Sequence, residues 1–443
     1  MKKARRGAAS FYIVAVSTLI LVMLATSFAT VIISEVARTS NDDLSQSAYD
    51  SAMAGLEDAK VAYSSYRRCV EAGVPASTMK PSGTGAITCG DIRYWLEVEN
   101  DCYTVGHILG RIPKDEETEV VVGSTQTTGS STTSTNQAYT CVKIETELDD
   151  YRVTLNEENR RQTMRAQVGT GATNTVKKIR VSWTAVKTSA SDTLGLNYPN
   201  LSGGNLAFAP WNYATMANPP VVELQIVQTA PTFSLSQFDD AVVSGASSQT
   251  NRASMFLIPT KTVHSTNTKG IGTWSGSITS GKNVITAAQV AQTNDRTVYH
   301  KPFGVFCNPN TSSNFYCSVE VELPSPIGSS GGVRNNGTFM IAVSLPYQQP
   351  DTDFAIELIC DAGATCGDGI VADSMTGGVR LTNTQILMDS TGRANDLYRR
   401  VQARMETSDR AFDASYPIYA LEVLGSNPVT KTVDAKYEYN FYF

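Results

Sequence analysis

The sequence predicts an α+β protein in which a long N-terminal transmembrane and stem helix precedes a β-rich, disulfide-bonded globular head. Three observations support this prediction. An uncharged segment begins close to the N-terminus, a proline-free stretch continues it, and short strand-like runs between turn residues fill most of the remaining chain. A chain of 443 residues composed in this way can bury a sizeable core outside the helix.

The first predicted element is a membrane-spanning helix. A short basic leader, residues 1–7, precedes the uncharged run Ala8–Ser34, and the next charged residue is Glu35. As a helix this run would extend about 40 Å, which is enough to cross a bilayer. A cleaved secretory signal has a shorter apolar core followed by a small-residue cleavage site, so we expect the segment to be retained.

The second predicted element is an amphipathic stem helix over residues 35–68, which contain no proline and a single glycine, Gly55. Apolar residues recur on one side of it at helical spacing. They are Leu44, Ala48, Ala52, Leu56, Ala59, Tyr63 and Tyr66. Such a stripe needs a cover, which is either the protein's own head or a neighbouring copy.

Hydroxyl residues in the membrane helix give a second candidate packing face. Thr26, Ser27, Thr30 and Ser34 fall within one arc at 100° per residue, and small hydroxyl residues suit close helix packing in lipid. The alternative is that such a helix tolerates hydroxyls at any position. Both interpretations stay open at this point.

The charges predict an orientation. Lys2, Lys3, Arg5 and Arg6 lie before the apolar run, and only Arg38 lies close behind it. The positive-inside rule therefore places the N-terminus in the cytoplasm and the head outside, as in a single-pass membrane protein. The formal net charge is −6, with no basic cluster after the leader, so we expect no nucleic acid as a partner.

The eight cysteines agree with a head outside the cytoplasm, since an even count there favours disulfides. Two pairs are close enough in sequence to be local, Cys307 with Cys317 and Cys360 with Cys366. The other four could pair among themselves: Cys69, Cys89, Cys102 and Cys141. A metal site is disfavoured, because there is no C-x-x-C and the three histidines are scattered.

Strand-like runs follow residue 150. Val176–Val186 and Val221–Val227 alternate apolar and polar residues, and Asn336-Gly337 is a strong hairpin signal. Ser390–Asn395 predicts the loop of another hairpin, with Asp396–Met405 as its second arm. Further strand-like runs are Met255–Ile258, Val319–Leu323, Thr338–Leu345, Phe354–Ile359, Ile386–Met388, Tyr416–Leu424 and Ala435–Phe443.

Changes in composition suggest a division into segments. After the leader, the membrane helix (8–34) and the stem (35–68), a cysteine-stapled region with a first β lobe covers 69–188. A Gly/Asn/Pro-rich linker covers 189–220, and a β-rich head covers 221–443.

The leader and stem carry a family resemblance. Arg6-Gly7-Ala8-Ala9 joins a basic leader ending in glycine to a long apolar helix, and an alanine-rich, acidic stretch, Ser47–Ala59, opens the stem. In this layout the N-terminus resembles type IV prepilins and pseudopilins. The closer likeness is to PilX-type minor pilins and the large minor pseudopilins of type II secretion. The resemblance covers the leader, membrane helix and stem; a C-terminal hairpin, Gly392–Met405, is compatible with a pilin head.

The resemblance implies cleavage after Gly7 by a prepilin peptidase, extraction from the membrane into a helical fibre, and other pilin subunits as partners of the helix. Major pilins usually have phenylalanine first and glutamate fifth in the mature chain, where this sequence has Ala8 and Tyr12. The glutamate is commonly absent from minor, tip-located members. The resemblance therefore favours a minor pilin. The size of the head and its predicted location at the cell surface suggest a use in adhesion or tip initiation.

Catalytic motifs do not support an enzyme. The sequence has no G-x-S-x-G, H-E-x-x-H, P-loop or EF-hand loop, so we expect neither an enzyme nor a cofactor. Ser77-Thr78-Met79-Lys80 matches S-x-x-K without its partner motifs. Asp239/Asp240, Asp351/Asp353 and the loop 361–373 offer oxygens for Ca²⁺, although solvated turn carboxylates are the commoner explanation.

Two other classes of function remain open. One is a single-pass, N-anchored surface protein that binds glycans or proteins without polymerising; Trp211, Tyr213 and Trp274 lie in the kind of Gly/Asn/Pro-rich surroundings that such a site uses. The other is an anchored hydrolase whose residues meet only in three dimensions. Removal of the leader would distinguish a pilin from both of these classes, because a simple anchor would keep residues 1–7.

Overall fold

The computed structural model confirms the α+β class. It describes residues 6–122, 126–128, 131–133, 137–168, 176–186, 220–229, 252–260, 277–279, 282–285, 301–307, 315–323, 338–346, 350–360 and 378–407. Several sequence-based predictions lie outside these residues. They concern nearly all of the linker 189–220, Asp239/Asp240, the loop 361–373, Cys366, Trp211, Tyr213, Trp274 and the two runs after residue 407.

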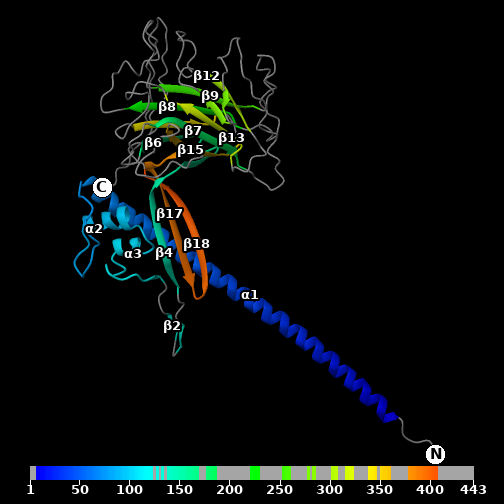
Figure 1. Cartoon of the computed structure of the whole chain (residues 1–443). Coiled ribbons are helices and arrows are strands. Elements are labelled where there is room, and N and C mark those ends of the chain that lie inside the picture. The colour runs from blue at the N-terminus through cyan, green and yellow to red at the C-terminus, as the bar shows by residue number, and fades with distance from the viewer. Residues whose placement is uncertain are drawn as a thin grey trace, which may run out of the picture. The chain divides into compact units, whose positions relative to one another are not determined.

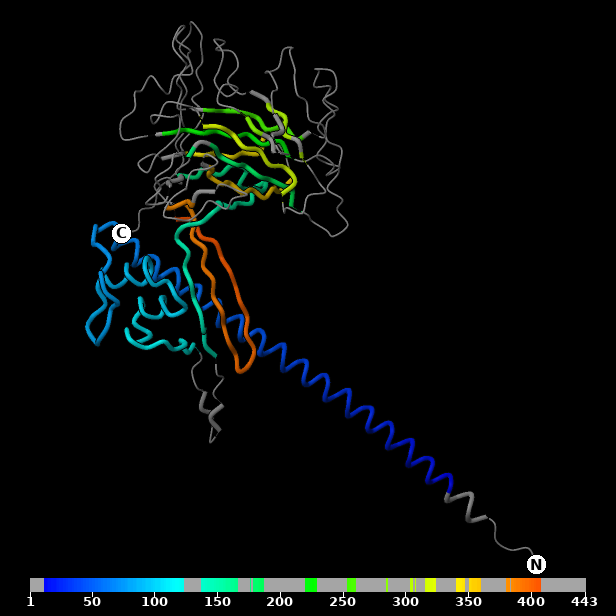
Figure 2. The backbone as a smooth tube through the Cα atoms, viewed as in Figure 1, coloured from blue at the N-terminus to red at the C-terminus, as the bar shows by residue number. Residues whose placement is uncertain are grey.

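The N-terminal part is one uninterrupted helix, α1 (Arg6–Glu71), which joins the predicted membrane helix to the predicted stem (Figures 1 and 2). No proline interrupts it, so the backbone hydrogen bonds of the helix can form along its whole length. It ends where Gly73 takes a left-handed conformation (φ +68°) and its amide donates to the carbonyl of Val70. Glycine adopts this conformation without strain, and Pro75 follows it.

Three short helical segments follow α1: α2 (Cys89–Tyr94), the π-helical turn η1 (Trp95–Glu99) and α3 (Thr104–Ile108). Thr88 and Asp91 form a capping box at the start of α2, each side chain bonding the backbone amide of the other residue. Trp95 and Val105 are fully buried in the same hydrophobic cluster as Leu56 and Ala59 of α1. These segments therefore cover one flank of the stem.

Two large sheets carry all but two of the described strands. The first has the order β1-β4-β17-β6-β14-β8-β9-β12, with β18 paired to β17. Its strands are β1 (Val120–Val121), β4 (Gln137–Leu148), β6 (Arg161–Val168), β8 (Val222–Thr229), β9 (Arg252–Thr260), β12 (Lys301–Phe306), β14 (Thr338–Ser344), β17 (Leu381–Ala394) and β18 (Leu397–Glu406).

The second sheet has the order β10-β11-β13-β7-β15-β16, with β5 paired to β15. Its strands are β5 (Tyr151–Leu155), β7 (Val176–Ala185), β10 (Ser277–Thr279), β11 (Lys282–Ile285), β13 (Cys317–Glu322), β15 (Thr352–Cys360) and β16 (Gly378–Val379). A separate two-stranded sheet pairs β2 (Gln126–Thr128) with β3 (Ser131–Thr133).

The described residues form two hydrophobic cores. One lies between the two large sheets and includes Leu224, Met255, Trp183 and Phe354, all at most 1% exposed. The other lies between α1, the segments α2 to α3 and the strands β4, β17 and β18. Because β17 pairs with β6 as well as with β4 and β18, this one strand takes part in both regions.

The predicted division into a β lobe at 69–188 and a head at 221–443 is wrong for these sheets. β7 lies between β13 and β15, and β14 pairs with both β6 and β8, so strands from either side of the linker interleave. Inward apolar residues of both sequence segments are needed to fill one core, which is why composition alone does not mark a boundary.

One hairpin prediction also needs correction. The chain reverses at Asn395–Asp396, where Asn395 has φ +50°, whereas Ser390–Ala394 continue β17. Asparagine tolerates this left-handed conformation, so a two-residue turn suffices. The other hairpin signal, Asn336-Gly337, lies outside the described residues, so that prediction stays untested.

Candidate functional site: α1 and the seat of its stem

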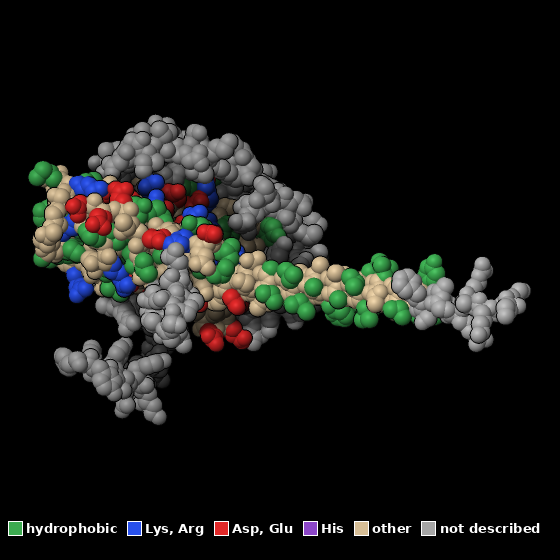
Figure 3. All heavy atoms as spheres, turned by 90° about the horizontal axis from the view of Figure 1, so that it is seen from below, with side chains coloured by type: hydrophobic (Ala, Val, Ile, Leu, Met, Phe, Trp, Pro, Cys, Tyr) green, Lys and Arg blue, Asp and Glu red, His purple; other side chains and the backbone are tan. Residues whose placement is uncertain are grey.

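The first half of α1 is an apolar surface without a cover. From Tyr12 to Val36 its large hydrophobic side chains are all exposed, for example Ile20 at 51% and Ile33 at 67% (Figure 3). Within the described residues, this is the helix long and apolar enough to cross a membrane. We refer to residues 12–34 as the apolar half. Gly7 and Ala8 lie within α1 before it, and cleavage between them remains a prediction.

The hydroxyls of the apolar half bond within their own helix. Thr26 and Ser27 both donate to the carbonyl of Met23 at 2.9 Å, Thr30 donates to Ser27, and Ser34 donates to Val31. These bonds satisfy the hydroxyls in lipid without a partner helix. A role of the four residues in helix packing therefore stays a prediction.

The second half of α1 is seated on the protein's own sheet. Ala48, Ala52 and Ala59 are fully buried and Leu56 is 2% exposed, while Leu44 is only half-buried. Strands β4, β17 and β18 cover this face. We call the helix-facing side of these three strands the seat. Of the two covers expected from sequence, the head of the same chain is the one observed.

Two glycines bring helix and sheet into close contact. A Cβ on Gly392 of β17 would overlap the backbone of Ala48 and Ala52. A Cβ on Gly55 of α1 would overlap the hydroxyl of Ser390 and lie 2.9 Å from Cγ2 of Val142. The β4–β17 register shifts between Thr391 and Gly392, so a bulge lies at the contact. The seat thus fixes the position of α1 along its own axis and its rotation about that axis, both relative to the sheet.

Polar contacts hold the same joint. The phenol of Tyr139 in β4 donates to Asp58 of α1 at 2.8 Å, and Arg111 pairs with the same carboxylate at 2.7 Å. Burial, together with this hydrogen bond to Asp58, raises the pKa of Tyr139, so the phenol keeps the proton it donates. Farther along, Arg67 donates to the carbonyl of Thr407 at 2.7 Å, and Arg399 donates to the Ser45 hydroxyl at 2.8 Å.

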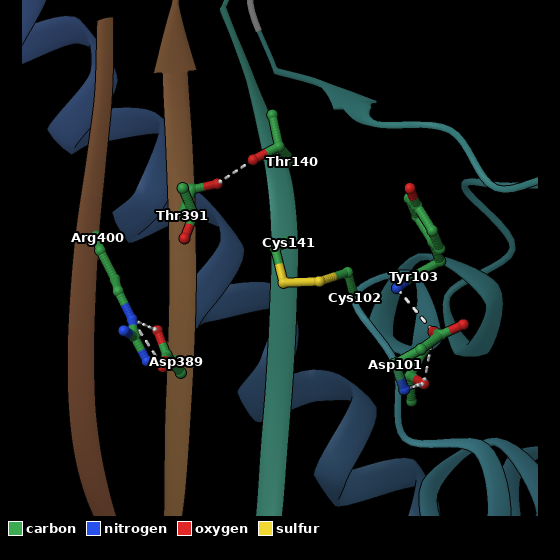
Figure 4. Close-up of a disulfide and its surroundings, with 9 residues drawn as sticks. Asp101, Cys102, Tyr103, Thr140, Cys141, Asp389, Thr391 and Arg400 are labelled. Carbon is green, nitrogen blue, oxygen red and sulfur yellow. Dashed lines mark hydrogen bonds and ion pairs between the residues drawn. A yellow bond between two sulfur atoms is a disulfide. The ribbon is translucent and has the colours of Figure 1, made fainter.

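Disulfides fasten the segments that flank the stem. Cys69 at the end of α1 bonds Cys89 at the start of α2, and Cys102 bonds Cys141 of β4 (Figure 4). The four cysteines before residue 150 therefore do pair among themselves. Cys307 bonds Cys317, the local pair expected from spacing. Cys360 ends β15, and its expected partner Cys366 is outside the described residues.

One group of carboxylates has the spacing of a metal site. Oxygens of Glu99, Asp101 and Glu117 lie within 4.8 Å of one another. Lys80 already supplies a cation, since its Nζ is 2.5 Å from Glu99 and 3.7 Å from Glu117. The hydrogen bond to Glu99 raises the pKa of Lys80, so the amine stays charged. The arrangement is explained as an ion-pair network.

The same contacts bear on Ser77-Thr78-Met79-Lys80. Ser77 donates to Asp91 at 3.4 Å, while Lys80 pairs with the acidic group described above. The two side chains are thus engaged with different partners, and S-x-x-K chemistry needs the amine beside the hydroxyl. Of the other acidic candidates, Asp353 accepts a hydrogen bond from Thr154 at 2.5 Å, as a strand-surface carboxylate does.

Sequence reasoning missed the contacts that define the seat. Ser390 and Gly392 entered only as parts of a predicted hairpin, Tyr139 carried no motif, and Gly55 was noted only as the one glycine of the stem. Gly392 is a glycine within a strand-like run, and such a glycine often marks a place where another backbone approaches closely. Together with the alanine stripe of the stem, it is the signal that could have suggested this contact. No protein-family model, curated protein or solved structure matches the chain.

Proposed function

We propose that this chain is a structural, pilin-like subunit, a minor pilin of a type IV pilus or a related fibre. The observation that carries the proposal is the division of one unbroken helix into an uncovered apolar half and a half seated on its own head. The resemblance at Arg6-Gly7-Ala8-Ala9 supports it independently.

The division suits a subunit that exchanges lipid for protein. Lipid tails and other apolar helices both shield an apolar helix face from water. The apolar half can therefore serve as a membrane anchor before assembly and as a packing surface afterwards. The seated half of α1 meanwhile needs no neighbour, because strands β4, β17 and β18 cover it. Such a subunit can fold its head outside the membrane while α1 anchors it, and can then assemble through the helix alone.

Continuity of α1 also sets the geometry of assembly. Gly392 and Gly55 fix the helix against the sheet, and no break separates the seated half from the apolar half. The head would therefore take a constant position relative to the packed helices. A flexible tether would suffice for a static anchor.

N-terminal sequencing of the protein from its native cells, with the prepilin peptidase intact and then deleted, tests the proposal. We expect a mature start at Ala8 that depends on the peptidase. An intact leader, Met1–Gly7, in both strains would contradict the proposal and leave a static single-pass anchor whose head should be assayed for ligand binding.

A further inference from the structure

We infer that the head contains a hinge between the seat and the strands of the first core, and that Glu406 is the latch that holds this hinge closed. We call these strands, β5 to β16, the sandwich. The hinge does not depend on fibre assembly, because both bodies that it joins belong to the head.

The two hydrophobic cores are separate bodies joined by short connections. Among the described residues they have no member in common: Leu381 of β17 belongs to the core of the sandwich, whereas Ile386 belongs to the core beneath the seat. Between these two positions β17 pairs with β6 at Leu381 and Thr382, and its pairing with β4 shifts register between Thr382 and Leu387. The other described connection is the turn from β4 into β5, residues 149–150 (Figure 2). Short connections of this kind are where hinges form.

Polar residues fill the joint between the two cores. Asp150, Thr384 and Gln385 are at most 9% exposed, and the hydroxyl of Thr384 has no hydrogen-bond partner in the described part of the chain. The side chain of Gln385 takes the place of a paired strand. It accepts a hydrogen bond from the backbone amide of Arg152 at 3.0 Å and donates one to the carbonyl of Arg152 at 2.6 Å. Bodies that meet through polar groups, without a large apolar interface, are expected to move relative to each other.

Glu406 ties the two bodies together from the end of β18. Its carboxylate accepts a hydrogen bond from the phenol of Tyr151 at 2.6 Å and another from the side-chain amide of Gln162 at 2.9 Å. Tyr151 begins β5 and Gln162 lies in β6, so one side chain of β18 holds two strands of the sandwich. Both bonds are to a charged acceptor, which makes them stronger than bonds between neutral groups.

The position of Gln162 makes its bond the one that a swing must break. It lies five residues from Gln167, where β6 pairs with β17, which is about 17 Å along an extended strand. Gln385 and Arg404 bond residues at or next to the turn between β4 and β5, so their bonds lie close to the pivot and can persist. Release of Glu406 would therefore free the sandwich, while the seat stays on α1.

The test measures distances in the full chain in detergent with pairs of nitroxide labels on a bioorthogonal amino acid, which leaves the native disulfides intact. One pair replaces Ser64 of α1 and Glu158 in the turn after β5, both exposed, and so spans the joint. A second pair, Ser64 and Lys143 of β4, lies within the body of the seat. In Glu406→Leu we expect the distance distribution of the first pair to become at least twice as wide as without this substitution, and that of the second pair to stay unchanged.

Two further variants make the result specific to the latch. Tyr151→Phe removes one bond to Glu406 and keeps the buried ring, so it should widen the Ser64–Glu158 distribution to a smaller extent. Glu145→Leu removes an exposed carboxylate from β4 and should leave this distribution unchanged.

Equal widths with and without Glu406→Leu and Tyr151→Phe would overturn the inference. So would a distribution in Glu145→Leu as wide as in Glu406→Leu. Widening of the Ser64–Lys143 distribution in Glu406→Leu would also overturn it, because the two bodies would then not move as units.

Discussion

The two halves of α1 have similar helical geometry and opposite surroundings. In the seated half, Ala48, Ala52 and Ala59 are buried without exposed area, and two glycine contacts allow backbone to approach backbone. In the apolar half, bulky residues such as Ile13 and Phe28 are 70% and 68% exposed. The seated half, which the chain's own strands cover, presents small residues at the contact. The apolar half, whose large apolar residues are exposed, is suited to contact with lipid or with another helix.

The two halves of this single helix therefore have separate roles. The seated half contributes to stability of the head, as any core helix does. The apolar half contributes nothing to that core, so changes in it should leave the free energy of unfolding of the head unaltered. Substitutions in the seat should do the reverse, lowering stability without changing membrane insertion.

The largest effect is expected from the disulfide that ties the flanking loop to β4. Replacing Cys102 and Cys141 together by alanine releases a closure spanning 39 residues. The unfolded chain then gains entropy, and the free energy of unfolding should fall by about 4 kcal/mol. Urea unfolding of the full chain in detergent, followed by tryptophan fluorescence, measures the change. An unchanged midpoint would show that the flanking loop does not support the seat.

Gly392→Ala should come next. The added methyl overlaps the backbone of Ala48 and Ala52, so helix and sheet must separate, at a cost of about 3 kcal/mol. Gly85→Ala is the matched control, because nothing lies within 4 Å of a Cβ there. Equal urea midpoints for the two variants would contradict the close approach at the seat.

Tyr139→Phe should have a smaller effect. It keeps the ring but removes the hydroxyl that donates to Asp58, and a hydrogen bond to a charged group is worth about 1.5 kcal/mol. Because the pKa of Tyr139 is raised in the folded protein, its contribution is complete below the ordinary tyrosine pKa and is lost as pH rises above it. The variant should therefore be less sensitive to alkaline unfolding. Tyr398→Phe, at an exposed tyrosine, should show neither effect.

The smallest effect concerns the outer face of the sheet. The hydrogen bond from Arg400 lowers the pKa of Asp389, so this carboxylate stabilises the fold above its unfolded pKa and loses that contribution as pH falls through the lower, folded value. Arg400→Gln should reduce stability slightly at neutral pH, and the difference from the unmodified protein should vanish in acid. If the stability difference between Arg400→Gln and the unmodified protein grew as pH fell, Arg400 would not be the cause of the lowered pKa of Asp389.

Local patterns in the sequence predicted the helix and eight of the 18 described strands, but neither β4 nor β6. Proline-free continuity from Ala8 through the stem anticipated α1, and the alternation around Trp183 anticipated β7. The stripe of Ala48 and Ala52 marked a buried face, because helical spacing needs no knowledge of the partner.

Long-range pairing could not be predicted in the same way. Nothing local shows that β7 lies between β13 and β15, or that β17 returns from the far end of the chain to Ala48. Such contacts depend on which surfaces complement each other in three dimensions. The seat belongs to this second kind of information.

The central claim is that the apolar half of α1 packs against helices of other subunits after release from the membrane. Its most direct test places a photo-crosslinking amino acid at Thr30 in the full chain and irradiates native cells with the prepilin peptidase intact and deleted. The account predicts crosslinks to other pilin-like subunits only when the peptidase is intact. Adducts that are the same in both strains and contain no other subunit would contradict it.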